Sequence, residues 1–234
     1  MRRVAHVLGE LMITLGLVVL LYCAYSLLWT DVTTKRAQAG LRDQLDHGGP
    51  TPVGPMPADP NPLDPMPGDP NPLPGQPTRR PVVAPAVGKP LAVLHIPRFG
   101  ERWSWIVVEG VDLIQLADGP GPYPGTALPG RLGNFAVAGH QVTHGSLFAL
   151  LARTRVGDQV DVDVGGRRYV YVVTSAAAVA PDDVGAVAPV PDHPGARPTQ
   201  RMVTLTTCHP PYRSTQRFVV HGLLHGVRTA ADSP

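Results

Sequence analysis

Three side chains in this sequence have the types needed for acyl transfer to a thiol: Cys208, His140 and Arg217. A thiolate is a strong nucleophile toward a carbonyl carbon. An imidazole nearby favours the thiolate and later protonates a leaving amine, and a guanidinium holds the substrate or stabilises the oxyanion of a tetrahedral intermediate. These residue types predict nucleophilic attack on an amide-type bond, in a scheme that needs no carboxylate or amide to orient the histidine.

The thiol lies at the end of a short β-branched run, Thr204 to Cys208, which a proline-rich turn follows. Interpreted as a strand with period two, the run points Val203 and Leu205 to an apolar side and Cys208 to the opposite, polar side. A substrate can reach a thiol in that place. The alternative is a buried, inert cysteine that packs as a small hydrophobic residue.

Cysteine usage favours a reactive thiol. The chain has 2 cysteines, and the other, Cys23, lies in an apolar run near the N-terminus. If a membrane separates the two, they cannot form an intramolecular disulfide, and Cys208 is a lone thiol in an exported domain. A leftover thiol of that kind indicates reactivity.

His140 stands at the end of a second predicted strand, the run from Asn134 to Gly139. Phe135 and Val137 face one side of that strand, and two alanines and His140 face the other. The small residues on the histidine's side leave room for another group to approach. A lone histidine is more often structural than catalytic, so the catalytic interpretation depends on this placement, at a strand end and off the apolar face like the thiol.

Arg217 opens the strand after the thiol. The runs Met202–Cys208 and Arg217–Leu224 are joined by a short loop, and a hairpin places the end of one strand near the start of the next. Arg217 is therefore expected near Cys208 in space. The alternatives are that Arg217 is an exposed edge-strand residue or that Arg213, in the loop, takes its part.

No metal or cofactor site is expected. His140 and His144 follow a strand, lie among glycines and lack a glutamate between them, so zinc binding is disfavoured. Asp182 and Asp183 are interpreted as part of a solvated loop rather than as a calcium site. The Gly119–Pro122 segment is interpreted as a turn, not as a phosphate-binding loop.

Residues 91–228 have the composition and length of one folded domain. Short strand-like runs recur there between glycine and proline turns, with Ser146–Leu151 as the only helical candidate, a pattern typical of an antiparallel barrel or sandwich. Residues 229–234 are expected to be a frayed tail. The predicted strands are Leu91–Ile96, Trp105–Val108, Asn134–Gly139, Gln159–Val164, Arg168–Ser175, Met202–Cys208 and Arg217–Leu224.

A linker at residues 30–90 precedes this domain. It begins with a polar stretch, Thr30–Arg42, that could continue a helix, and it includes a decapeptide repeat at 55–74. The proline-rich part cannot bury enough apolar surface to fold, and it is expected to adopt polyproline II as a semi-rigid spacer with a reach of up to ~120 Å. A ligand role for the repeat is the less favoured alternative.

Residues 11–29 are uncharged and apolar all round, and their length fits a membrane-spanning helix. Aromatic residues cluster at the far end, as they do at a membrane interface. Basic residues on the two sides nearly balance, so they do not set the orientation. A signal peptide cleaved near Ala37–Ala39 is the alternative, disfavoured because that position lies well past the apolar run. The net charge of +2 gives no indication of nucleic-acid binding.

The site residues lie in segments that resemble the sortases. Thr204–Cys208 has the form of the TLxTC signature of that family, Arg217 has the place of its arginine, and Gly133–His140 resembles the segment with its histidine. Leu94–Arg98 and Gly119–Pro129 add further matches. The resemblance covers residues 91 to 224 and is most like class E, the type common in high-GC actinobacteria.

The resemblance implies a mostly all-β fold: an eight-stranded barrel with short helices, preceded by one transmembrane helix and the proline-rich linker. It also implies cysteine transpeptidation, with Cys208 as the nucleophile, His140 as the acid/base and Arg217 as the ligand of substrate and oxyanion. His209 stands where many class E relatives have asparagine, and His144 where a tyrosine is expected. The residues expected to line the substrate pocket are Thr206, Thr207, His209 and His144. No cofactor is implied.

The resemblance further implies partners and a location. The substrates are surface proteins with a C-terminal sorting signal of LAxTG or LPxTG type, cleaved between threonine and glycine. The acyl group then passes to an amine of a peptidoglycan precursor or to a pilin lysine. Residues 1–10 are then cytoplasmic, the single transmembrane helix anchors the chain in the cell membrane, and the linker holds an extracytoplasmic catalytic domain out from the bilayer.

Two other functions are weighed against this one. A papain-like extracytoplasmic cysteine hydrolase normally has its cysteine before its histidine, whereas His140 precedes Cys208 here. A non-enzymatic surface interaction module on a proline-rich stalk would make the three site residues a coincidence. Three motifs in the right order favour the transpeptidase.

Overall fold

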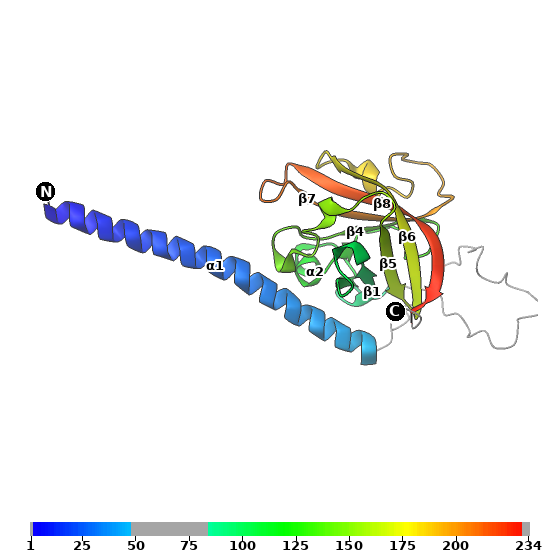
Figure 1. The fold of residues 1–234 in the computed structure, drawn as a ribbon, viewed down its shortest axis with the longest axis horizontal. Helices are drawn as coiled ribbons and strands as arrows, with labels where there is room; N and C mark the ends of the chain where they lie inside the picture. The colour runs from blue at the N-terminus through cyan, green and yellow to red at the C-terminus, as the bar shows by residue number, and fades with distance from the viewer. Residues whose placement is uncertain (1, 48–83, 231–234) are drawn as a thin grey trace, which may run out of the picture.

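The computed structural model describes residues 2–47 and 84–230. In Figure 1 a long helix, α1, leads to a barrel of strands, and the second half of the helix runs along the outside of that barrel. α1 spans Arg2–His47. The expected continuation of the helix through Thr30–Arg42 is therefore confirmed, and the helix ends a little beyond that stretch.

The first half of α1 is long and apolar enough to cross a membrane. Residues His6–Cys23 have a mean hydropathy of 1.9, and none of this window is buried. Tyr25 and Trp29 follow it with stacked rings whose centroids lie 5.5 Å apart. This candidate overlaps the span predicted at residues 11–29.

Within the described residues, eight strands form one sheet, in the order β2-β1-β5-β6-β8-β7-β4-β3. The backbone N–H of Val108 in β2 donates to the carbonyl of Pro120, beside β3, over 2.8 Å, so the two edge strands meet and the barrel nearly closes. The strands are β1 (Pro90–His95), β2 (Ser104–Val108), β3 (Gly121–Pro122), β4 (Gly133–Ala138), β5 (Gln159–Val164), β6 (Arg167–Val179), β7 (Arg201–His209) and β8 (Gln216–Thr229).

The sheet is mixed, which corrects the predicted antiparallel arrangement. β4 pairs with β7 in parallel, with Phe135 opposite Val203 and Ala138 opposite Thr206. Period-two alternation cannot distinguish the two directions, because side chains alternate between faces in the same way in both. The chain reaches this parallel pairing through a long crossover that contains β5 and β6.

Apolar side chains fill the barrel interior. Val203 and Leu205 are fully buried there, which confirms the alternation predicted for the strand before Cys208. Tyr171 is buried as well, and its hydroxyl accepts a hydrogen bond from the Gly130 N–H over 2.8 Å. Burial of an aliphatic side chain such as Leu205 contributes about 1.5–3 kcal/mol. This packing fixes the strands that position the predicted site.

The short helices differ from expectation. The predicted helix Ser146–Leu151 is wrong: the chain forms a 3-10 turn at each end of this segment, and Ser146 has a φ of 50°, in the left-handed region, so no regular helix starts there. The helix α2 was not predicted, since its exposed Leu113 and Ile114 give it no amphipathic period. The short elements are η1 (Pro97–Phe99), α2 (Leu113–Asp118), η2 (His144–Ser146), η3 (Leu151–Arg153) and η4 (Val184–Val187).

The proline-rich repeat at residues 55–74 lies outside the described residues. The helix before it, however, contacts the barrel directly: Gln38 hydrogen-bonds to Ile106 of β2, and Leu41 packs on Ile106 and Val108. Residues 30–47 of the expected linker are therefore helical and contact the barrel, whereas residues 48–83 lie outside the described residues. The second half of α1 packs against the folded domain.

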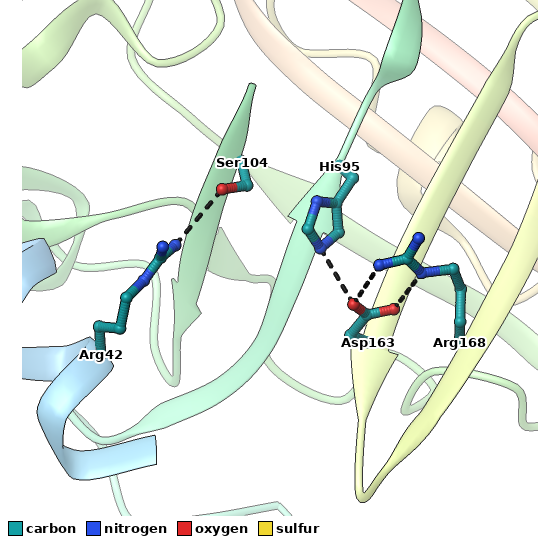
Figure 2. A network of polar contacts seen from close by, with 5 residues as sticks. All are labelled: Arg42, His95, Ser104, Asp163 and Arg168. Atoms are coloured by element: carbon teal, nitrogen blue, oxygen red, sulfur yellow. Dashed lines mark hydrogen bonds and ion pairs between the residues drawn. The ribbon is translucent and has the colours of Figure 1, made fainter. Parts of the chain in front are cut away.

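A charged network on the outer face joins three strands (Figure 2). Asp163 of β5 accepts two hydrogen bonds of 2.7 Å from Arg168 of β6, and a contact of 3.1 Å joins it to His95 of β1. Burial alone would raise the pKa of Asp163, but the hydrogen bonds from Arg168 and His95 lower it to about 2. Beside this network, Arg42 of α1 donates to Ser104 of β2 over 3.3 Å.

Replacement of Asp163 by asparagine should lower the free energy of unfolding at neutral pH by about 1 kcal/mol, because the paired contact with Arg168 is lost. A carboxylate with a lowered pKa stabilises the fold above its ordinary pKa, here 3.8, and this stabilisation is lost as the pH falls toward 2. Urea unfolding of wild type and variant across this range measures the difference. Asp182→Asn, in an exposed loop, is the control. A destabilisation that stays constant down to the lowest pH would contradict the prediction.

Candidate active site

Cys208 and Arg217 face each other across the β7–β8 hairpin. Their Cα atoms are register partners in this antiparallel pair, and such residues share a face with Cβ atoms about 4.5–5.5 Å apart. The predicted hairpin placement of Arg217 is therefore confirmed. Cys208 is half-buried and forms no disulfide with Cys23, so the strand holds the thiol while leaving it accessible.

The parallel pairing of β4 with β7 brings His140 to the same edge of the barrel. Ala138 is the register partner of Thr206. The hydrogen bonding between the two chains continues past the end of β4, because the Gly139 N–H donates to the Thr206 carbonyl over 3.0 Å. The next alternate residues on the two chains are His140 and Cys208. His140 and Cys208 therefore occupy neighbouring backbone positions, just past the last hydrogen bond between the two chains.

The backbone on both sides of His140 is fixed by tight contacts. Thr207 donates its hydroxyl to the Gly139 carbonyl over 2.8 Å. A Cβ at Gly139 would lie 2.7 Å from the ring of Phe148, so no side chain fits there. The Phe148 N–H donates to the His140 carbonyl over 2.9 Å. The glycine before the histidine is thus required by close packing against Phe148.

The guanidinium of Arg217 lies over the turn between β7 and β8. Its Nη1 donates to the carbonyls of Ser214, over 3.4 Å, and Gln216, over 3.1 Å. Both bonds are exposed, and an exposed bond to a neutral carbonyl contributes little. A bound substrate can therefore replace these carbonyls as the hydrogen-bond acceptor of the guanidinium with little loss of free energy.

The imidazole of His140 sits in a half-buried place beside a second histidine. Its ring stacks on that of His144, with centroids 4.8 Å apart and 27° between the planes. Burial lowers the pKa of His140, and the nearby His144 lowers it further. Within the described residues its Nε2 is buried without a hydrogen-bond partner. A neutral imidazole with an unused nitrogen is able to accept a proton.

Replacement of His144 by glutamine should raise the pKa of His140 toward its ordinary value, because the repulsion between the two rings is removed. Titration of the His140 ring signals by NMR measures this change. His193→Gln, in an exposed loop, is the matched control and should leave those signals unchanged. A His140 pKa that stays the same or falls in His144→Gln would contradict the stated role of the neighbour.

The threonines of β7 have polar partners that the sequence analysis did not identify. Thr206 shares a hydrogen bond of 2.9 Å with the hydroxyl of Tyr123. Thr204 donates to Asn134 over 2.7 Å and contacts His221 Nδ1 at 2.9 Å. The period-two pattern placed these threonines on the polar side of β7. Their partners come from other strands and loops, and only the register of the sheet reveals them.

The four residues expected to line the pocket have differing surroundings. Thr206 and Thr207 are buried and hydrogen-bonded as described above, and the ring of His209 packs against Phe218 with centroids 5.6 Å apart. His144 covers one face of the His140 ring. Their contact with substrate stays a prediction. Residues 2–47 and 84–230 contain no group of three or more His, Cys, Asp or Glu side chains arranged to hold a metal ion.

Comparison with known proteins identifies the family of the chain. The sortase domain family model matches residues 94–225. The chain is 30% identical over 230 residues to sortase SrtE1 of Streptomyces coelicolor, a match that covers 93% of this chain and 56% of that protein. This chain thus spans little more than half the length of SrtE1. It is 31% identical over 238 residues to sortase SrtE2 of the same organism, covering 97% and 83% of the two chains.

The solved structures include sortase E from Streptomyces avermitilis. It is 39% identical to this chain, with a TM-score of 0.57, and the match covers 63% of this chain and 96% of that one. Fold, motifs and relatives therefore agree. The chain belongs to the sortase family, and its relatives identify its type as class E.

Proposed function

We propose that this protein is a membrane-anchored cysteine transpeptidase that cleaves a C-terminal sorting signal and transfers the acyl part to an amine. The observation that supports it most is that three strands bring three groups to one edge of the barrel. Cys208 lies opposite Arg217 across β7–β8, and His140 follows the parallel β4–β7 pair. Similarity to the sortase E relatives supports the same chemistry.

In the first half-reaction the sulfur of Cys208 attacks the carbonyl carbon of the bond between threonine and glycine. His140 accepts the thiol proton as the carbon–sulfur bond forms. The guanidinium of Arg217 stabilises the negative charge on the carbonyl oxygen. The carbon–nitrogen bond then breaks, and His140 returns its proton to the leaving glycine amine. A thioester on Cys208 remains.

In the second half-reaction an incoming amine attacks the thioester carbonyl. His140 takes the amine proton, Arg217 again stabilises the oxyanion, and the carbon–sulfur bond breaks. The Cys208 thiolate then recovers its proton from His140. The product is a new amide, so the reaction exchanges one amine for another and needs no metal or redox cofactor.

The substrates proposed are surface proteins with a C-terminal signal of LAxTG or LPxTG type. The acceptor proposed is an amine of a peptidoglycan precursor or a pilin lysine. With the first half of α1 in the cell membrane and the N-terminus inside, the barrel lies on the outer side. The apolar window His6–Cys23, none of it buried in the protein, supports this anchoring.

The test uses the full chain in detergent micelles with labelled LAxTG and LPxTG peptides and triglycine as the amine acceptor. Mass spectrometry should detect the ligated peptide, cut after threonine, only when amine is present. Peptides with the threonine and glycine exchanged are the control. Equal hydrolysis of unrelated peptides would instead support a papain-like hydrolase, and no turnover of any peptide would support a non-enzymatic module.

A further inference from the structure

We propose that the second half of α1 positions the loop that contains His140, and that Asp31 is the positioning residue. The inference rests on the proposed function, because it concerns the rate of that reaction. It goes beyond anchoring, since the helix then belongs to the active-site assembly. The loop in question comprises residues 140–148, between β4 and η3.

One face of α1 is buried against the barrel. Thr34, Gln38 and Leu41 are the buried residues on it, with exposed fractions of 0%, 8% and 6%. Their spacing of three or four residues puts them on one side of the helix. Leu41 packs on Ile106 and Val108 of β2. Two polar side chains are buried in this face, and each has partners on the barrel.

Gln38 binds the barrel at β2, one of the two edge strands of the sheet. Its side-chain oxygen accepts from the Ile106 N–H over 2.8 Å, and its nitrogen donates to the Ile106 carbonyl over 3.0 Å. The same nitrogen donates to the carbonyl of Asp118, at the end of α2, over 2.8 Å. Thr34 donates to the neighbouring carbonyl of Ala117 over 2.7 Å. The amide of Gln38 thus satisfies the backbone of edge strand β2 as a neighbouring strand would.

The same helix face contacts the histidine loop. Asp31 accepts a hydrogen bond from the Gly145 N–H over 2.9 Å. Gly145 has a φ of 78°, and His144 and Ser146 on either side have φ of 52° and 50°. Successive residues in the left-handed region are unfavourable unless the surroundings hold them there. The carboxylate of Asp31 supplies such a contact at the centre of this strained turn.

The strained turn is coupled directly to His140. The ring of His144 stacks on that of His140 at 4.8 Å. The Phe148 N–H, just beyond the turn, donates to the His140 carbonyl over 2.9 Å. A shift of the turn away from Asp31 therefore displaces both the ring that covers His140 and the bond that fixes its backbone.

The positioning helix is continuous with the candidate membrane span. α1 has no break between Cys23, where the apolar window ends, and Asp31. At the helical rise of about 1.5 Å per residue, Asp31 lies about 12 Å beyond that window. The helix that anchors the chain therefore also holds the histidine loop close to the bilayer surface.

The test compares Asp31→Ala with Asp31→Asn in the full chain in detergent micelles. Asparagine keeps an oxygen that accepts from Gly145, whereas alanine does not. We expect Asp31→Ala to lower kcat for peptide ligation about 10-fold with little change in KM, and Asp31→Asn to restore most of it. Asp43→Ala is the matched control: it is on the same helix, its side chain is 74% exposed, and its activity should equal that of wild type.

Two outcomes would overturn the inference: Asp31→Ala with the kcat of wild type, or Asp31→Asn as slow as Asp31→Ala. A second measurement separates this inference from the proposed function. NMR signals of the His140 ring and hydrogen exchange at the Gly145 amide should change in Asp31→Ala and not in Asp31→Asn. If wild type ligates no peptide, the proposed function fails, and these two signals then decide whether Asp31 positions the loop.

Discussion

Replacement of Cys208 by alanine is expected to lower peptide cleavage and ligation by about 10⁴-fold or more, because without the sulfur no thioester forms. The fold should be unaffected. The side chain of Cys208 lies at the end of β7, outside the packed interior, and the strand is held there by backbone bonds to β8. The urea midpoint of the variant should therefore match that of wild type.

The measurement is the rate of product formation by mass spectrometry, with enzyme in excess so that slow turnover is detected. Cys23→Ala is the matched control, since this thiol is exposed on α1 in the candidate span. Its rate should equal that of wild type. Incubation of wild type with peptide alone should add the acyl mass to the protein, and that mass should be missing from Cys208→Ala. Turnover retained by the alanine variant would exclude Cys208 as the nucleophile.

Much of the site could be predicted because its parts are local. The period-two pattern placed Cys208 off the core face, and a hairpin between adjacent strands brings the start of the second strand, and with it Arg217, close to the end of the first. The strand Gln159–Val164 was predicted with its observed bounds. Alternation is set by side chains a few positions apart, so a single sequence contains enough information for these features.

The position of His140 could be predicted only in part. The sequence indicated that the histidine ends a strand, but not that this strand lies parallel to β7. A parallel pair joins segments that are far apart in the chain, and its stability comes from burial on both faces rather than from a turn signal. The partners Tyr123 and Asn134 of the threonines on β7 were missed for the same reason.

The helix contacts were missed for a different physical reason. Asp31, Thr34 and Gln38 made the stretch after the apolar run look solvated, because polar residues on a helix usually face water. Here they are hydrogen-bonded to backbone groups at the end of α2, the edge of β2 and the turn at Gly145. Whether a polar residue is solvated or buried with a partner depends on those distant backbone groups.

Replacement of Arg217 by alanine is expected to lower kcat for ligation by about 10²- to 10³-fold, the effect of losing one donor to an oxyanion. Arg217→Lys should recover only part of this loss, because an ammonium does not reproduce the planar donor geometry of a guanidinium. Stability should change little, since the bonds of Arg217 to Ser214 and Gln216 are exposed. Steady-state kinetics with the labelled sorting peptide measures the effect.

Arg213→Ala is the control that tests the register argument. Arg213 lies exposed in the loop between β7 and β8, whereas Arg217 is the direct register partner of Cys208. The rate of Cys208 alkylation by iodoacetamide should be similar in all these variants, because the guanidinium acts on the substrate oxygen rather than on the thiol. A larger loss in Arg213→Ala than in Arg217→Ala would contradict this assignment. Slower alkylation in Arg217→Ala would instead mean that the arginine activates the sulfur.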